Sequence, residues 1–222
     1  MKKLIDSEKF SNGLEIFIAV LLGVTAVLTA YASWQSSLYG GNQAGKYTQG
    51  TATISEANSM FNDASQFIAQ DMAVWNRITD LRIDLEFAKE KNDALSEERN
   101  QWKLDQIMAD NVTPEFQKAI EWADAQKEST SPFVMPGFIE SYSDNAQVKY
   151  DEGKDQIAEG EKANGLGDIL GLVTVIFSVV LFLLGICNTF KNIRTRLVIG
   201  ISSVISLMFG LVIMFNVPYV SL

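Results

Sequence analysis

Three long stretches of this sequence contain no charged residue, and they constrain the fold more than any other feature. They cover residues 16–45, 169–190 and 197–222. A helix needs about 20 apolar residues to cross a hydrocarbon core of about 30 Å. Buried helices of a water-soluble protein are a poor alternative, because stretches this long and uncharged on every side would need a much larger protein around them. The sequence therefore predicts transmembrane helices at residues 15–34, 166–187 and 197–216.

The first stretch also resembles a secretory signal. Ala30 and Ala32 precede Ser33 in the small-residue pattern of a cleavage site, which leaves cleavage after Ala32 as an alternative. The region before the apolar core is long, however, and carries Asp6, Glu8 and Glu15. We therefore expect an uncleaved membrane anchor.

The charges outside these stretches predict the topology. Lys2, Lys3 and Lys9 precede the first span, and Lys191, Arg194 and Arg196 lie between the second and third. Because basic flanks stay cytoplasmic, we expect a cytoplasmic N-terminal arm (1–14), a basic cytoplasmic turn (188–196) and an extracytoplasmic tail (217–222).

The segment between the first two spans, residues 35–165, is expected outside the cytoplasm. It holds 12 lysines and arginines against 23 aspartates and glutamates, a net charge of −11. Such a segment repels nucleic acid and anionic lipid headgroups, so we expect neither as its partner.

A seven-residue repeat follows the first span, and it alternates large with small side chains. The large residues include Tyr47, Ile54, Phe61 and Ile68, and the small ones include Ala57 and Ala64. The same register continues through Asp71, Trp75 and Ile78. A repeat of 3.5 residues over several heptads is typical of a coiled coil.

A second set at seven-residue spacing precedes the second span. Its positions are Ala146, Gly153, Gly160 and Gly167, interleaved with Tyr150, Ile157, Asn164 and Gly171. Glycine costs a helix about 1 kcal/mol per interior site, and close helix approach is the usual compensation. We expect one helix over residues 138–187 that pairs antiparallel with the helix after the first span. Each set pairing with a copy of itself in an oligomer is the alternative.

Shorter helices are expected between the two sets. Residues 93–108 read as a helix, and Thr113 and Pro114 read as the N-cap and first position of another. The loop that follows is unusually apolar, with Phe133, Val134, Met135 and Phe138. It either docks a partner or covers the helix ends, and the second interpretation is favoured.

The sequence predicts no catalytic, metal or cofactor site. The chain has no histidine and one cysteine, Cys187, which no histidine accompanies. We therefore expect no enzyme and no cofactor.

Residues 160–168, which read Gly-Glu-Lys-Ala-Asn-Gly-Leu-Gly-Asp, lead into the apolar residues 172–177 and 181–186. This stretch resembles a group of small bacterial membrane proteins that share an Ala-Asn-x-x-Gly-Asp entry into a transmembrane helix. The resemblance implies a bacterial envelope protein and brings no activity with it. We expect the chain to be integral to the cytoplasmic membrane of a bacterium.

Together these patterns predict an all-α membrane protein with three transmembrane helices and an antiparallel helical stalk. We expect it to contact the lipid bilayer and to assemble with itself or another membrane protein, as a structural or interaction protein of the envelope. The alternatives are a sensory input module for a separate signalling partner and a channel or transport subunit.

Overall fold

A computed structural model describes residues 8–220 of the chain, and the side chains of residues 10–220. Lys2 and Lys3, on which part of the expected topology rests, lie outside the described residues. The described residues form helices and turns and no strand, which confirms the all-α class. The elements are α2 (Glu8–Glu90), α3 (Ala94–Asp110), α4 (Pro114–Asp124), the 3₁₀ helix η1 (Pro132–Val134), α5 (Phe138–Ser141), α6 (Asp144–Cys187) and α7 (Ile193–Asn216).

The chain divides into two compact units, and both long helices contribute residues to each of them. The spanning unit comprises residues 8–50 and 155–220 of the described chain, and the acidic unit comprises residues 51–154. Residues 35–50 and 155–165, which the sequence groups with the acidic segment, thus belong to the unit that holds the apolar helices.

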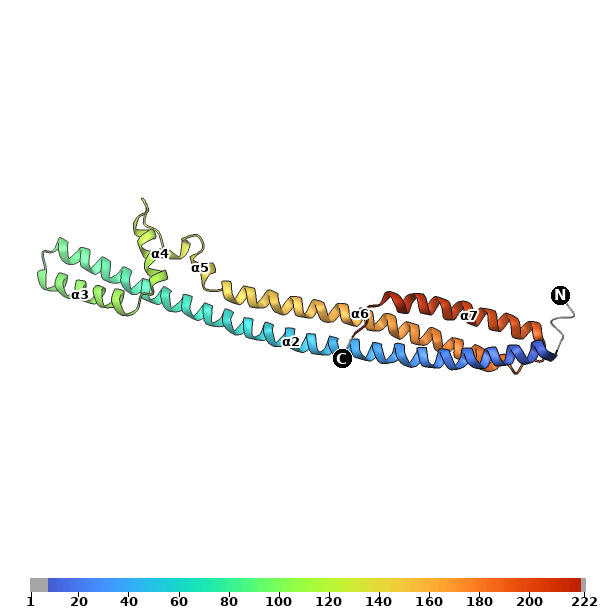
Figure 1. Ribbon diagram of the computed structural model, residues 1–222. Helices are drawn as coiled ribbons and strands as arrows, with labels where there is room; N and C mark the ends of the chain where they lie inside the picture. The colour runs from blue at the N-terminus through green and yellow to red at the C-terminus, as the bar shows by residue number, and fades with distance from the viewer. Residues whose placement is uncertain (1–7, 221–222) are drawn as a thin grey trace. The chain divides into compact units, whose positions relative to one another are not determined.

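The spanning unit consists of three apolar helices side by side, formed by the first part of α2, the last part of α6 and α7 (Figure 1). Each is long and apolar enough to cross a membrane, which confirms the three predicted spans at the level of length and composition. Their shared core contains Ile18, Leu170, Val173, Phe177, Leu184 and Leu207. Large apolar side chains also face outward, among them Val27, Phe182 and Phe209. A helix that is apolar on its outer face as well is suited to contact with lipid.

A buried arginine joins one set of ends of the three helices. Arg196 of α7 is 7% exposed, and its guanidinium donates hydrogen bonds to Glu15 of α2 at 3.2 Å and to Asn188, just after α6, at 2.6 Å. Charge-assisted bonds of this kind fix the mutual position of the groups that they join.

The opposite ends are joined by the residues that follow α7. The Gln35 side chain bonds both the N–H and the carbonyl of Val220, at 3.1 and 3.2 Å, and the Tyr39 hydroxyl donates to the carbonyl of Pro218 at 2.8 Å. The Ser36 hydroxyl donates to the carbonyl of Gly167 at 2.9 Å. These bonds attach the tail and α6 to the same turn of α2.

A polar residue lies at each end of every apolar segment, and the number of residues between the two ends is the same in all three segments. The pairs are Glu15 and Gln35 in α2, Asp168 and Asn188 in and after α6, and Arg196 and Asn216 in α7. Each pair is 20 residues apart, which corresponds to about 30 Å at 1.5 Å per residue. This length matches the hydrocarbon thickness of a bilayer.

The acidic unit has an aromatic core of its own. Phe116, Ala119 and Ile120 of α4 are buried against Ile78 of α2 and Phe138 of α5. The rings of Phe116 and Phe138 stack with their centroids 5.8 Å apart. As the sequence predicts, Thr113 caps α4 by accepting a hydrogen bond from the N–H of Phe116, and Pro114 begins the helix.

The expected single helix over residues 138–187 is wrong, because the chain breaks at Tyr142 and Ser143 and α6 begins at Asp144. The Ser141 hydroxyl donates to the carbonyl of Phe138 and the Ser143 hydroxyl to that of Glu140. Serine side chains that bond nearby backbone carbonyls compete with the helical pattern. The helix predicted over residues 93–108 is α3, with Asp93 as its N-cap.

Candidate functional site

The small residues of the α2 repeat lie on its buried face. Ala57 and Ala64 are 0% and 4% exposed, and Asp71 and Ile78 continue the buried register. The large residues of the repeat, Tyr47, Ile54, Phe61 and Ile68, are half-buried. In α6, Ala146, Gly153, Gly160 and Gly167 are buried, and Tyr150, Ile157, Asn164 and Gly171 are half-buried.

In the spanning unit, two of these glycines lie directly against aromatic residues of α2. A Cβ atom added at Gly160 would lie 2.7 Å from Cδ1 of Tyr47, and one added at Gly167 would lie 3.2 Å from Cβ of Tyr39. A side chain at Gly160 would require the Tyr47 ring to move, and one at Gly167 would require α2 to shift slightly at Tyr39. The glycines therefore permit a helix approach that a side chain would hinder.

In the acidic unit, α2 and α6 also make side-chain contacts. The rings of Phe61 and Tyr150 meet edge to face at 6.4 Å, and Lys149 pairs with Glu56 at 3.2 Å. Exposed pairs of this kind contribute little energy, so burial of the small residues and the aromatic contact carry the packing here.

Gly171 does not take part in a close approach, because a Cβ atom there would have no atom within 4 Å. From this point the buried face of α6 runs through Leu170, Val173 and Phe177. The Phe177 ring lies against α7, where a Cβ atom added at Gly210 would be 2.5 Å from it. Where α7 packs against α6, the buried side of α6 therefore differs from the side that carries Gly160 and Gly167.

The apolar loop lies largely inside the acidic unit. Phe138 is 4% exposed, and Phe133 and Met135 pack against the same core. Val134 is 61% exposed and is the member of this group that faces solvent. Most of the loop is therefore part of the core of the acidic unit.

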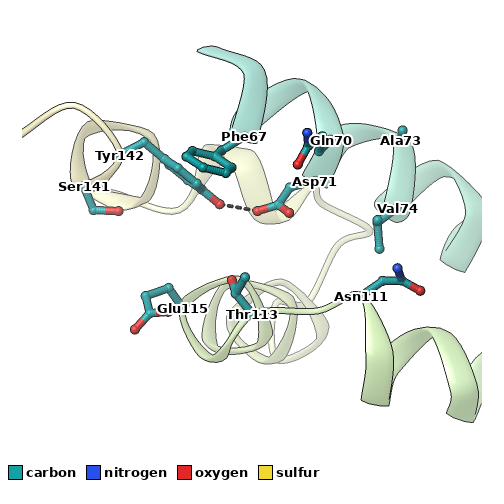
Figure 2. Close-up of a pocket in the computed structure, with 10 residues that line it drawn as sticks. All are labelled: Phe67, Gln70, Asp71, Ala73, Val74, Asn111, Thr113, Glu115, Ser141 and Tyr142. Carbon is teal, nitrogen blue, oxygen red and sulfur yellow. Dashed lines mark hydrogen bonds between the residues drawn. The ribbon is translucent and has the colours of Figure 1, made fainter. Parts of the chain in front are cut away.

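The acidic unit contains a cavity of about 660 Å³ beside Asp71. It is bounded by α2, by the connection from α3 into α4, and by the end of α5 (Figure 2). Its walls are formed by Phe67, Gln70, Asp71, Ala73, Val74, Asn111, Thr113, Glu115, Ser141 and Tyr142. Cavities that hold small organic ligands have volumes of about 300–1,000 Å³, so this cavity is the candidate functional site.

Asp71 and Tyr142 form the polar centre of this cavity. The Tyr142 hydroxyl donates a hydrogen bond to Oδ2 of Asp71, and the two side chains point toward one another in Figure 2. Asp71 is 7% exposed. The second carboxylate oxygen, Oδ1, accepts no hydrogen bond from the described part of the chain.

The surroundings keep Tyr142 in its protonated, donating form. Burial raises the pKa of the Tyr142 hydroxyl far above its usual value, and the hydrogen bond to Asp71 and the charges of Asp71 and Glu115 raise it further. The pair therefore combines a neutral donor with a carboxylate that stands mostly out of water.

Some of the remaining polar side chains of the cavity form hydrogen bonds within the protein, and others do not. The hydroxyls of Thr113 and Ser141 bond backbone groups of their own segments. Within residues 10–220, the side chains of Gln70, Asn111 and Glu115 make no hydrogen bond, and all three residues are exposed. They are available to a ligand at the mouth of the cavity.

The seven-residue repeat of α2 gives one indication of this site in the sequence. Asp71 occupies a core position of the repeat, where a charged residue is unfavourable without a partner. The sequence alone did not identify Tyr142 as that partner, because it placed Tyr142 inside a continuous helix.

Comparisons with models of protein families, with curated proteins and with solved structures found no match.

Replacement of Gly160 by leucine is expected to destabilise the spanning unit. Leucine at this position would collide with Tyr47, and overpacking of this kind costs about 1–3 kcal/mol. Gly165→Leu is the matched control, because a Cβ atom at Gly165 meets no atom within 4 Å. That variant is expected to gain up to about 1 kcal/mol of helix propensity. Thermal unfolding of both variants in detergent would measure the difference, and equal stability would show that the glycine is not needed for packing.

Replacement of Tyr142 by phenylalanine is expected to destabilise the acidic unit by about 1–3 kcal/mol, because Asp71 would lose its hydrogen-bond donor while still buried. Tyr150→Phe serves as the control, because the Tyr150 ring contacts Phe61 and its hydroxyl has no hydrogen bond within the described chain. Chemical denaturation of the two full-length variants would compare them. A Tyr142→Phe variant as stable as Tyr150→Phe would contradict the assigned role of the hydroxyl.

Proposed function

We propose that the protein is a membrane-anchored interaction protein whose acidic helical unit lies outside the cytoplasm and contacts a partner in an envelope assembly. Three apolar helices anchor it. The partner is a second copy of the chain or another membrane protein. The seven-residue register of α2 and α6 supports a coiled-coil-like pairing that stiffens the anchored chain.

One observation carries this proposal: the first helical hairpin of the acidic unit exposes large apolar side chains. Ile83 and Phe87 lie one turn apart on α2 and are each 60% exposed, and Leu95 and Trp102 of α3 are 77% and 63% exposed. Each pair occupies one face of its helix. In a unit rich in charge, such faces are typical of a surface that another protein covers.

The proposed topology follows from charge. Lys191, Arg194 and Arg196 surround the turn between α6 and α7, and basic residues at the ends of spans remain in the cytoplasm. With three spans, this arrangement puts residues 35–165 and the segment after α7 on the extracytoplasmic side.

Cysteine labelling tests this topology. In a Cys187→Ala background, Asp63→Cys is expected to react with a membrane-impermeant maleimide on intact spheroplasts. Lys191→Cys is expected to react only after the membrane is permeabilised. The reverse pattern would place the acidic unit in the cytoplasm and overturn the proposed orientation.

Crosslinking in native membranes tests the partner contact. The protein is expected to be captured in a complex larger than one chain of 24.6 kDa, and Trp102→Ala together with Leu95→Ala is expected to reduce the yield of that complex. Asp63→Ala changes an exposed residue of α2 that lies away from this surface and is expected to have no effect. A particle of one chain in detergent, with no crosslinked product in membranes, would refute the proposal.

A second candidate function, sensory input to a separate signalling partner, is favoured by the cavity beside Asp71. A ligand there would contact α2, α4 and the end of α5 together. Binding energy that depends on the arrangement of these elements would favour one arrangement over others.

A further inference from the structure

The carboxylate of Asp71 is buried without a cation. It accepts a hydrogen bond from the neutral hydroxyl of Tyr142, and no lysine or arginine nitrogen of residues 10–220 lies within 4 Å of Asp71 or Glu115. Taking a carboxylate out of water costs several kcal/mol unless a charge or several donors balance it. One hydroxyl supplies a single donor, so the site has an unbalanced negative charge.

The nearby helix terminus does not supply the missing positive charge. The N-terminal end of α4 carries a partial positive charge, as any helix N-terminus does. Thr113 already caps it, however, and the Glu115 carboxylate stands in its first turn. Glu115 adds a second negative charge to the cavity wall, and this charge acts on Tyr142.

The remaining wall of the cavity suits the carbon skeleton of an organic ligand better than a bare ion. Phe67 and Tyr142 present aromatic rings, and Ala73 and Val74 present aliphatic surface. An ammonium group is attracted to a carboxylate and to the face of an aromatic ring alike. A calcium ion takes six to eight oxygen ligands, and the described residues contain no cluster of three acidic, histidine or cysteine side chains able to hold a metal.

We propose that the cavity beside Asp71 binds a small organic cation, with its ammonium group between Asp71 and Glu115 and its carbon skeleton against Phe67 and Tyr142. The amides of Gln70 and Asn111 face further polar groups of the ligand at the mouth. This binding deepens the sensory candidate and does not depend on the partner contact proposed for the α2–α3 hairpin.

Titration calorimetry on the full-length protein in an uncharged maltoside detergent tests the proposal. The probes are tetramethylammonium, choline and putrescine. The neutral isostere of choline, 3,3-dimethylbutan-1-ol, is the control for shape, and Ca²⁺ and Mg²⁺ are the controls for metal binding. At least one ammonium probe is expected to bind saturably with one site per chain, and the neutral isostere is expected not to bind.

Matched variants identify the site. Asp71→Asn keeps an acceptor for Tyr142 but removes the charge, and it is expected to weaken binding about tenfold or more. Glu115→Gln changes an exposed side chain and is expected to weaken binding less. Asp63→Asn removes a charge from the exposed face of the same helix and is expected to leave the affinity unchanged. Helicity and thermal unfolding would show that each variant is folded.

Three results would overturn the proposal. They are the absence of binding by all three ammonium probes, equal affinity of the Asp71→Asn and unaltered proteins, and saturable binding of the metal ions alone. None of these results bears on the crosslinking experiment, because the residues changed there, Leu95 and Trp102, do not line the cavity.

Discussion

The hydrocarbon core of a bilayer does not tolerate unbalanced charge, and this constraint accounts for the polar groups of the spanning unit. At one end of the apolar segments, the terminal nitrogens of the Arg196 guanidinium donate to Glu15 and Asn188. At the other, Gln35 and Tyr39 bond the residues that follow α7. Between these layers the helices satisfy their own backbone groups, as lipid requires. The buried hydroxyls of Thr25 and Ser203 donate to carbonyls of their own helices, and the other buried side chains there are mostly apolar.

The elements that follow from a regular pattern could be predicted from sequence. Uncharged length predicted the three apolar helices, and the cap formed by Thr113 and Pro114 predicted the start of α4. The buried face of α2 could be predicted because residues at a seven-residue period lie on a single face of a helix. The place where the buried face of α6 shifts, near Gly171, was not predictable, because it depends on where α7 packs.

The cavity could not be predicted from sequence patterns, and the reason is physical. Asp71 is recognisable as a charge at a core position, but its partner depends on a break in the chain that two serine side chains create at residues 142–143. Tyr142 reaches Asp71 from that break. Local hydrogen bonds of serine are weak and compete with helix formation, so a pattern of apolar residues does not reveal which of the two prevails.

The turn between α2 and α3 has a consequence for the order in which the chain folds. Asn92 adopts a left-handed conformation with φ of 52°, and the N–H of Asp93 bonds the carbonyl of Ala88 at 3.0 Å, so the chain reverses within a few residues. Contacts that are local in sequence form without a large loss of chain entropy, whereas the approach of Tyr47 and Gly160 closes a loop of more than 100 residues. The α2–α3 hairpin is therefore expected to be a nucleus that forms early, and the glycine-mediated pairing of α2 with α6 is expected to be a late step.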